Sequence, residues 1–119
     1  MQKTPLFNGL LYRVFDPTEG AWLFISNTKD YEFRIKYLFG PNSLVNPLDD
    51  TTIETMDDGF QCELYLYPFE AKLFVQGVID GFESKLEALP LSEEYFAMHP
   101  EIDEVKYNSR LDPQNSKYF

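Results

Sequence analysis

The nine residues from Tyr31 to Phe39 limit the possible folds of this chain more than any other segment. Apolar or aromatic side chains alternate there with charged ones. Successive side chains of a β-strand point to opposite faces, so this alternation predicts a strand with one buried and one wet face. The chain must therefore build a sheet that covers an apolar core. The inward positions are Tyr31, Phe33, Ile35, Tyr37 and Phe39, and the charged positions are Glu32, Arg34 and Lys36.

Other segments show similar strand patterns, and turn residues separate them. Asp80-Gly81 is a turn signal, and it predicts that the following segment pairs back on the preceding one. Gly77 marks a bulge or a close backbone approach. Leu73 and Val75 are expected to share one face. Phe74 is grouped with Tyr65 and Tyr67 on a face that is either an exposed binding platform or covered by the second sheet or the C-terminal segment. Strands are predicted over residues 10–15, 21–26, 31–39, 53–56, 60–66, 70–79 and 82–86.

The pattern changes after Pro90, where Ser92 and the acids that follow it predict a short helix ended by Pro100. Six to eight strands without βαβ alternation predict a mainly all-β fold, an antiparallel β-sandwich or barrel-like fold with one short helix near the C-terminus. We expect a single domain over residues 1–119, with an ordered core at about 8–104 and a loosely ordered tail at 105–119.

The formal net charge of −10, from 20 acids and 10 bases, argues against nucleic-acid binding. It also disfavours direct binding to anionic lipid, whereas a basic protein partner is compatible with it. No apolar run is long enough to span a membrane. Cys62 is the single cysteine, which excludes an internal disulfide and favours a reducing, cytoplasmic location.

Cys62 and His99 are the only candidates for nucleophilic catalysis of the cysteine-hydrolase kind. Cys62 lies in a predicted strand at an inward position, where burial raises a thiol pKa and hides the sulfur from substrate. No phosphate loop or nucleophile elbow is present. We therefore expect no catalytic residues and no enzyme activity, and a cysteine-dependent enzyme is the weakest of the alternatives.

The acidic stretch from Asp49 to Asp58 raises the question of calcium. Its acids do not follow EF-hand spacing, although irregular loops can bind calcium in other ways. We expect neither a metal site nor a cofactor, and calcium binding by this stretch stays open. Asp49, Asp50, Asp57 and Asp58, together with Tyr65 and Tyr67 on a predicted wet face, form the candidate interaction surface.

Several segments spread over residues 8–104 resemble the kinetoplastid calpain-related domain, a domain of unknown function in calpain-like proteins of trypanosomatids. The order and spacing of these segments carry the resemblance. They are Asn8 to Arg13, Trp22 to Thr28, Phe39 to Ser43, Pro68, Glu70, Phe74 to Gly77, Gly81 to Lys85 and Leu91 to Phe96.

The resemblance implies a small non-catalytic protein associated with the submembrane cytoskeleton or the flagellum. Some members of that family carry acylated N-termini, whereas Gln2 follows Met1 here. The leading expectation is a protein-interaction or scaffold module with a protein partner, possible cytoskeletal partners included. A calcium- or lipid-responsive regulatory module is the alternative. Edge strands could also pair between copies, so a homodimer stays open.

Overall fold

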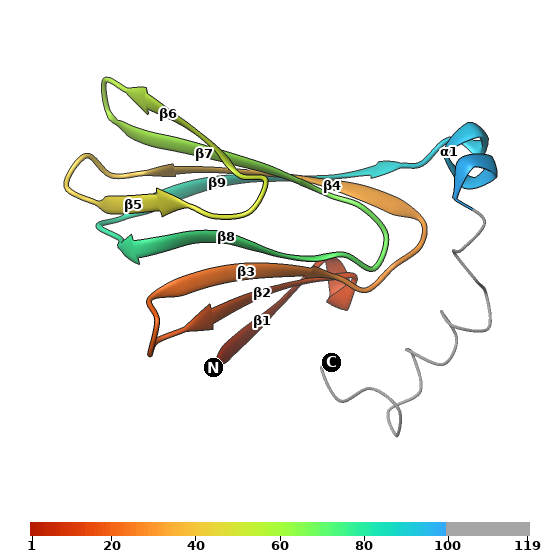
Figure 1. Ribbon diagram of the computed structural model, residues 1–119, viewed down its shortest axis with the longest axis horizontal. Coiled ribbons are helices and arrows are strands. Elements are labelled where there is room, and N and C mark those ends of the chain that lie inside the picture. The colour runs from red at the N-terminus through yellow and green to blue at the C-terminus, as the bar shows by residue number, and fades with distance from the viewer. Residues whose placement is uncertain (100–119) are drawn as a thin grey trace.

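The computed structural model describes residues 1–99 of the chain. Within them nine β-strands form two antiparallel sheets that lie face to face, and one short helix follows at the end (Figure 1). The strands are β1 (Gln2–Leu6), β2 (Leu11–Asp16), β3 (Ala21–Ser26), β4 (Tyr31–Phe39), β5 (Leu44–Pro47), β6 (Thr52–Met56), β7 (Gly59–Leu66), β8 (Ala71–Val78) and β9 (Phe82–Pro90). The predicted all-β fold is confirmed as a sandwich, and no closed barrel forms.

One sheet has the strand order β1-β2-β3-β8-β5, and the other has the order β6-β7-β4-β9. β4 lies between β7 and β9 and has the predicted bounds. Its inward aromatic and aliphatic side chains from Phe33 to Phe39 are fully buried. They meet Phe24 and Phe74 from the other sheet, with ring centroids of Tyr37 and Phe74 5.3 Å apart. The core is therefore an aromatic layer between the two sheets.

The sequence pattern misassigns part of β8. Trp22 pairs with Val75 and Leu23 with Leu73, so Phe74 is an extra residue in the register and forms a bulge. The bulge turns both Phe74 and Val75 into the core, while Leu73 is 40% exposed. For Phe74 the alternative of cover by the second sheet is therefore the correct one, and the expectation that Leu73 shares a face with Val75 is wrong.

Gly77 has the predicted close backbone approach. Its φ is +143°, and a Cβ at this position would collide with the carbonyl oxygen of Leu44 on β5. Any other residue would push β5 away from β8.

The turn at Asp80-Gly81 does not form the predicted hairpin. β8 and β9 lie in different sheets, because β9 pairs with β4 over its whole length, from Phe82 opposite Phe39 to Pro90 opposite Tyr31. The strands β1 and β5 are also absent from the sequence prediction. β1 pairs with β2 from Gln2 opposite Phe15 to Leu6 opposite Leu11, and β5 pairs with β8.

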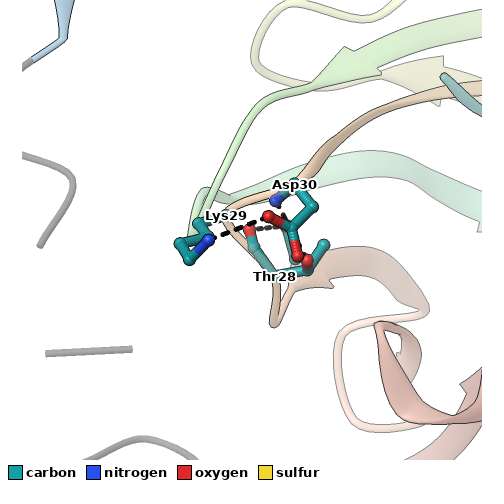
Figure 2. Close-up of polar contacts among 4 residues, drawn as sticks. Thr28, Lys29 and Asp30 are labelled. Carbon is teal, nitrogen blue, oxygen red and sulfur yellow. Dashed lines mark hydrogen bonds and ion pairs between the residues drawn. The ribbon is translucent and has the colours of Figure 1, made fainter. Parts of the chain in front are cut away.

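The connection from β3 to β4 crosses between the sheets through a polar turn. Thr28 accepts a hydrogen bond from the backbone N–H of Asp30 at 3.1 Å, and the ammonium of Lys29 lies 3.0 Å from the Asp30 carboxylate (Figure 2). Ser26 and Thr28 are fully buried beside the core. These local contacts provide hydrogen-bond partners for polar groups of the turn where the chain passes from one sheet to the other.

The predicted helix is α1 (Glu93–Met98), and Ser92 caps it by accepting a hydrogen bond from the backbone N–H of Tyr95 at 3.1 Å. The predicted stop at Pro100 and the predicted tail at 105–119 lie outside the described residues. No helix within residues 1–99 is long and apolar enough to cross a membrane.

Candidate functional site

A cavity of about 340 Å³ lies at the side of the sandwich where the edge strands β1 and β9 leave the two sheets open. Phe82 at the start of β9 faces the core, yet it remains 44% exposed because the opposite sheet does not cover it fully. The walls are mostly apolar, and one charged side chain is among them. The lining residues are Gln2, Thr4, Arg13, Phe15, Trp22, Gly77, Ile79 and Phe82.

Strand periodicity places Arg13 inside the sandwich. On β2 it lies on the same face as Leu11 and Phe15, and it pairs with Phe24 of β3, whose side chain is fully buried. The Arg13 guanidinium carbon lies 5.4 Å from the ring centroid of Trp22 and 5.7 Å from that of Phe82. These distances suit cation–π attraction to both rings.

One polar contact fixes the head of this side chain. Arg13 Nη1 donates a hydrogen bond to the Tyr37 hydroxyl at 3.0 Å. Within residues 1–99 no carboxylate forms an ion pair with Arg13. The cavity therefore presents a positive charge among aromatic rings, although the chain as a whole is strongly acidic.

The acids of the predicted loop fall into two separate groups, because the strand β6 lies between them. Asp49 accepts a hydrogen bond from the backbone N–H of Leu73 at 2.7 Å, and the Asp50 carboxylate lies 2.8 Å from the Lys72 ammonium. The hydrogen bond to Asp50 raises the pKa of Lys72, with burial acting in the opposite direction. Asp49 and Asp50 thus anchor the segment after β5 to β8.

Asp57 and Asp58 form the turn between β6 and β7, at the other end of β6. Asp58 borders a shallow hollow of about 360 Å³ together with Asp80 and Glu83. No group of three or more His, Cys, Asp or Glu within residues 1–99 is arranged to hold a metal ion. The calcium hypothesis gains no support from the part of the chain that the structure describes.

The two predicted tyrosines lie in different surroundings. Tyr65 is 45% exposed, and the Arg34 guanidinium carbon lies 5.6 Å from its ring centroid. A hydrogen bond to Glu63 and the charge of that residue raise the pKa of Tyr65. Tyr67 is half-buried under the Tyr95 ring of α1, with centroids 5.7 Å apart. The exposed position predicted for Tyr65 is confirmed, whereas the helix covers part of Tyr67.

Cys62 and His99 occupy unrelated places. Cys62 is fully buried within the core cluster, as predicted, and burial raises the pKa of its thiol from 9.0 to about 11. The His99 ring stacks on Tyr95 with centroids 4.0 Å apart, and its Nδ1 lies 2.8 Å from the Tyr95 carbonyl oxygen. Neither residue lines the cavity beside Arg13.

The outer faces of the two sheets carry opposite kinds of side chain. On the four-stranded sheet, charged residues of β4, β7 and β9 pair with one another: Arg34 with Glu32 at 3.6 Å, Lys36 with Glu63 at 3.5 Å and Lys85 with Glu87 at 3.7 Å. On the five-stranded sheet, the register places apolar residues in rows across the strands. These rows, named here the apolar face, are Val14-Leu23-Leu73, Tyr12-Ile25-Ala71 and Leu44-Val78.

Sequence reasoning did not find Arg13 or the apolar face. Both faces of β2 and β3 carry apolar residues, so alternation alone could not tell whether the Arg13 side chain lies on the inner or the outer face of its strand. One available signal was the charge itself, a single Arg within the apolar run of residues 10–15. The residues that complete the cavity, Phe82 and Ile79, are far along the chain, and only the sheet pairing reveals their proximity.

The fold and its cavity define a nine-stranded β-sandwich domain with a partly open interior within residues 1–99. The chain belongs to the family described as Domain of unknown function (DUF1935), which matches residues 1–91. No curated protein gives a significant match.

Two solved structures from Leishmania major share the fold. The NMR structure of SMP-1, a small myristoylated protein, is 33% identical with a TM-score of 0.74, over 87% of this chain and 82% of that one. A hypothetical protein is 30% identical with a TM-score of 0.73, over 79% of this chain and 86% of that one. The expected resemblance is thus confirmed for the domain family, whereas the link to calpain-like proteins is not among these findings.

Proposed function

We propose that this chain is a non-catalytic interaction module that binds a protein partner through the apolar face of its five-stranded sheet. The carrying observation is that this face exposes apolar side chains in several cross-strand rows, with Gln76 and Asn46 between the Leu73 row and the Leu44–Val78 row. Leu73 is 40% exposed, Val78 66% and Leu44 72%. Exposed apolar patches of this kind are typical of interaction sites.

The proposed absence of catalysis has two supports. Cys62 is buried with a raised thiol pKa, which disfavours a reactive thiolate. Among the described residues that line the cavity around Arg13, Thr4 carries the one hydroxyl, and no His, Asp, Glu or Cys is there to activate it as a nucleophile.

The proposal includes the setting that the sequence resemblance implies. The partner would be a protein of the submembrane cytoskeleton or the flagellum, and the module would act as a scaffold in a cytoplasmic, calpain-like context. The similarity to the small myristoylated protein of Leishmania major supports a setting near a membrane, since acylation is a membrane anchor in the protein that bears that name.

Site-specific photocrosslinking in cells tests this proposal with a matched pair of positions. Leu73 and Tyr65 are 40% and 45% exposed on the outer faces of opposite sheets. A photoreactive residue at position 73 should capture a defined cytoskeletal or membrane-associated protein, whereas the same group at position 65 should not.

Substitution sharpens the test, because Leu73→Glu should abolish capture from a second photoreactive site at Val78. Tyr65→Glu should leave that capture unchanged. Equal capture from positions 65 and 73, or capture that survives Leu73→Glu, would contradict an interface on the apolar face.

A further inference from the structure

The positive charge of Arg13 is not neutralised within the described part of the protein. A guanidinium has five N–H donors in a planar fork. The Tyr37 hydroxyl takes one of them, and no second acceptor for Arg13 lies within hydrogen-bond distance among residues 1–99. Partial burial of a charge is costly unless it is paired and hydrogen-bonded. The rings of Trp22 and Phe82 offset only part of that cost.

The cavity beside Arg13 has room for a small molecule. Its volume of about 340 Å³ falls in the usual range for ligand sites. The rings of Phe15, Trp22 and Phe82 supply apolar walls, and Gln2 and Thr4 of the edge strand β1 add polar groups. A few polar groups among apolar walls is the ordinary composition of such sites.

The charge balance narrows the ligand class. Among the described residues that line the cavity, Arg13 is the only charged one, so it neutralises a ligand with one negative charge but not a phosphate dianion. The guanidinium fork matches a carboxylate, which it can bind through two parallel hydrogen bonds. The aromatic walls require an apolar body next to that carboxylate.

We propose that this cavity binds a small organic monocarboxylate with an apolar body, its carboxylate on Arg13 and its body against the aromatic wall that Phe15, Trp22 and Phe82 form. The ligand enters between β1 and β9, where the inward-facing Phe82 is 44% exposed. This site lies on the inner side of the five-stranded sheet. It is therefore independent of the proposed protein interface on the outer face.

A titration of the full chain with decanoate, below its micelle concentration, tests the assignment by NMR. Decanoate should shift the Trp22 indole N–H and the Arg13 Nε–H resonances in a saturable way. The same concentration of 1-decanol, which has a chain of equal length and no charge, should leave Arg13 Nε–H unshifted and bind about tenfold or more weakly, the size expected for loss of a charged hydrogen-bonding pair.

Three variants separate this site from a general charge effect. Arg13→Gln should weaken decanoate binding about tenfold or more, and Lys36→Gln, which removes one positive charge from the outer face of the other sheet, should leave it unchanged. Arg13→Lys keeps the charge without the fork and should bind with intermediate affinity. Thermal unfolding and amide spectra check that each variant is folded.

The wild-type measurement stands even if a variant fails to fold. Absence of a saturable shift at Trp22, equal affinity for decanoate and decanol, or equal weakening by Arg13→Gln and Lys36→Gln would each overturn the proposal.

Discussion

The two outer faces of this sandwich differ more than the two inner ones. The inner faces both supply apolar and aromatic side chains to one core. On the outside, the four-stranded sheet carries charges that pair with neighbours on the same face, such as Lys36 with Glu63. The five-stranded sheet instead places Val14, Leu23 and Leu73 in one row across three strands.

This difference shows how a very acidic chain can still offer an apolar contact surface. Val14 is only 4% exposed although it lies outside the core cluster, in the outward row with Leu23. We therefore expect the apolar face to respond to substitution more strongly than the charged one.

The largest effect is expected at Val14. Val14→Asp puts an unpaired carboxylate in a buried position and should lower the free energy of unfolding by about 3 kcal/mol or more. Lys36→Asp at a central position of the charged face should change it by less than about 1 kcal/mol. Urea denaturation measures both. Equal losses would remove the distinction between the two faces.

The second largest effect is a pH dependence of stability. It comes from Cys62 on the inner face of the four-stranded sheet, in contrast to the charged outer face of the same sheet. The Cys62 pKa of about 11 when folded exceeds the ordinary value of 9.0, so the folded state favours the neutral thiol. The resulting stability is complete below pH 9.0 and is lost as pH rises toward 11, because the unfolded thiol ionises first. The loss should be roughly 1–3 kcal/mol.

Unfolding measured from pH 8 to pH 11 on the wild type and on Cys62→Val isolates this contribution, because other groups titrate equally in both proteins. A difference between the two curves that stays constant over this range would exclude the buried thiol as its source.

The smallest effect on stability is expected at the edge of the apolar face, where Leu44 and Val78 pair across β5 and β8. Both are mostly exposed, so the double variant Leu44→Ser/Val78→Ser should change the free energy of unfolding by no more than about 1 kcal/mol. It should elute much earlier from a hydrophobic-interaction column. Lys36→Ser is the control, and an equal shift in elution would show that the apolar rows do not govern surface adhesion.

Local patterns predicted seven of the nine strands within residues 1–99, missed β1 and β5, and predicted the strand partners poorly. The bounds of β4 follow from strict alternation between Tyr31 and Phe39, which needs no knowledge of the rest of the chain. The hairpin expected at Asp80-Gly81 was wrong because a turn signal does not say whether the next strand stays in the same sheet. The bulge at Phe74 shifts the alternation by one residue, which a pattern of period two cannot show.

The candidate sites were harder to predict for the same reason. Asp49 to Asp58 reads as one acidic loop, but the strand β6 separates its ends and gives Asp49 a structural hydrogen bond to Leu73. Arg13 meets Phe82 only because two sheets face each other. The exposed position of Tyr65 was predicted correctly because local alternation alone sets its face.

The strand order also determines when the chain can fold during its synthesis. Leu23 pairs with Leu73, and Tyr37 pairs with Ser84, so both sheets need strands that are synthesised much later in the chain (Figure 1). Such distant pairings fold slowly. A nascent chain that ends before β8 leaves β3 and β4 each with a missing neighbour. We therefore expect productive folding on the ribosome to wait until β9 has emerged, with chaperones shielding the aromatic segments until then.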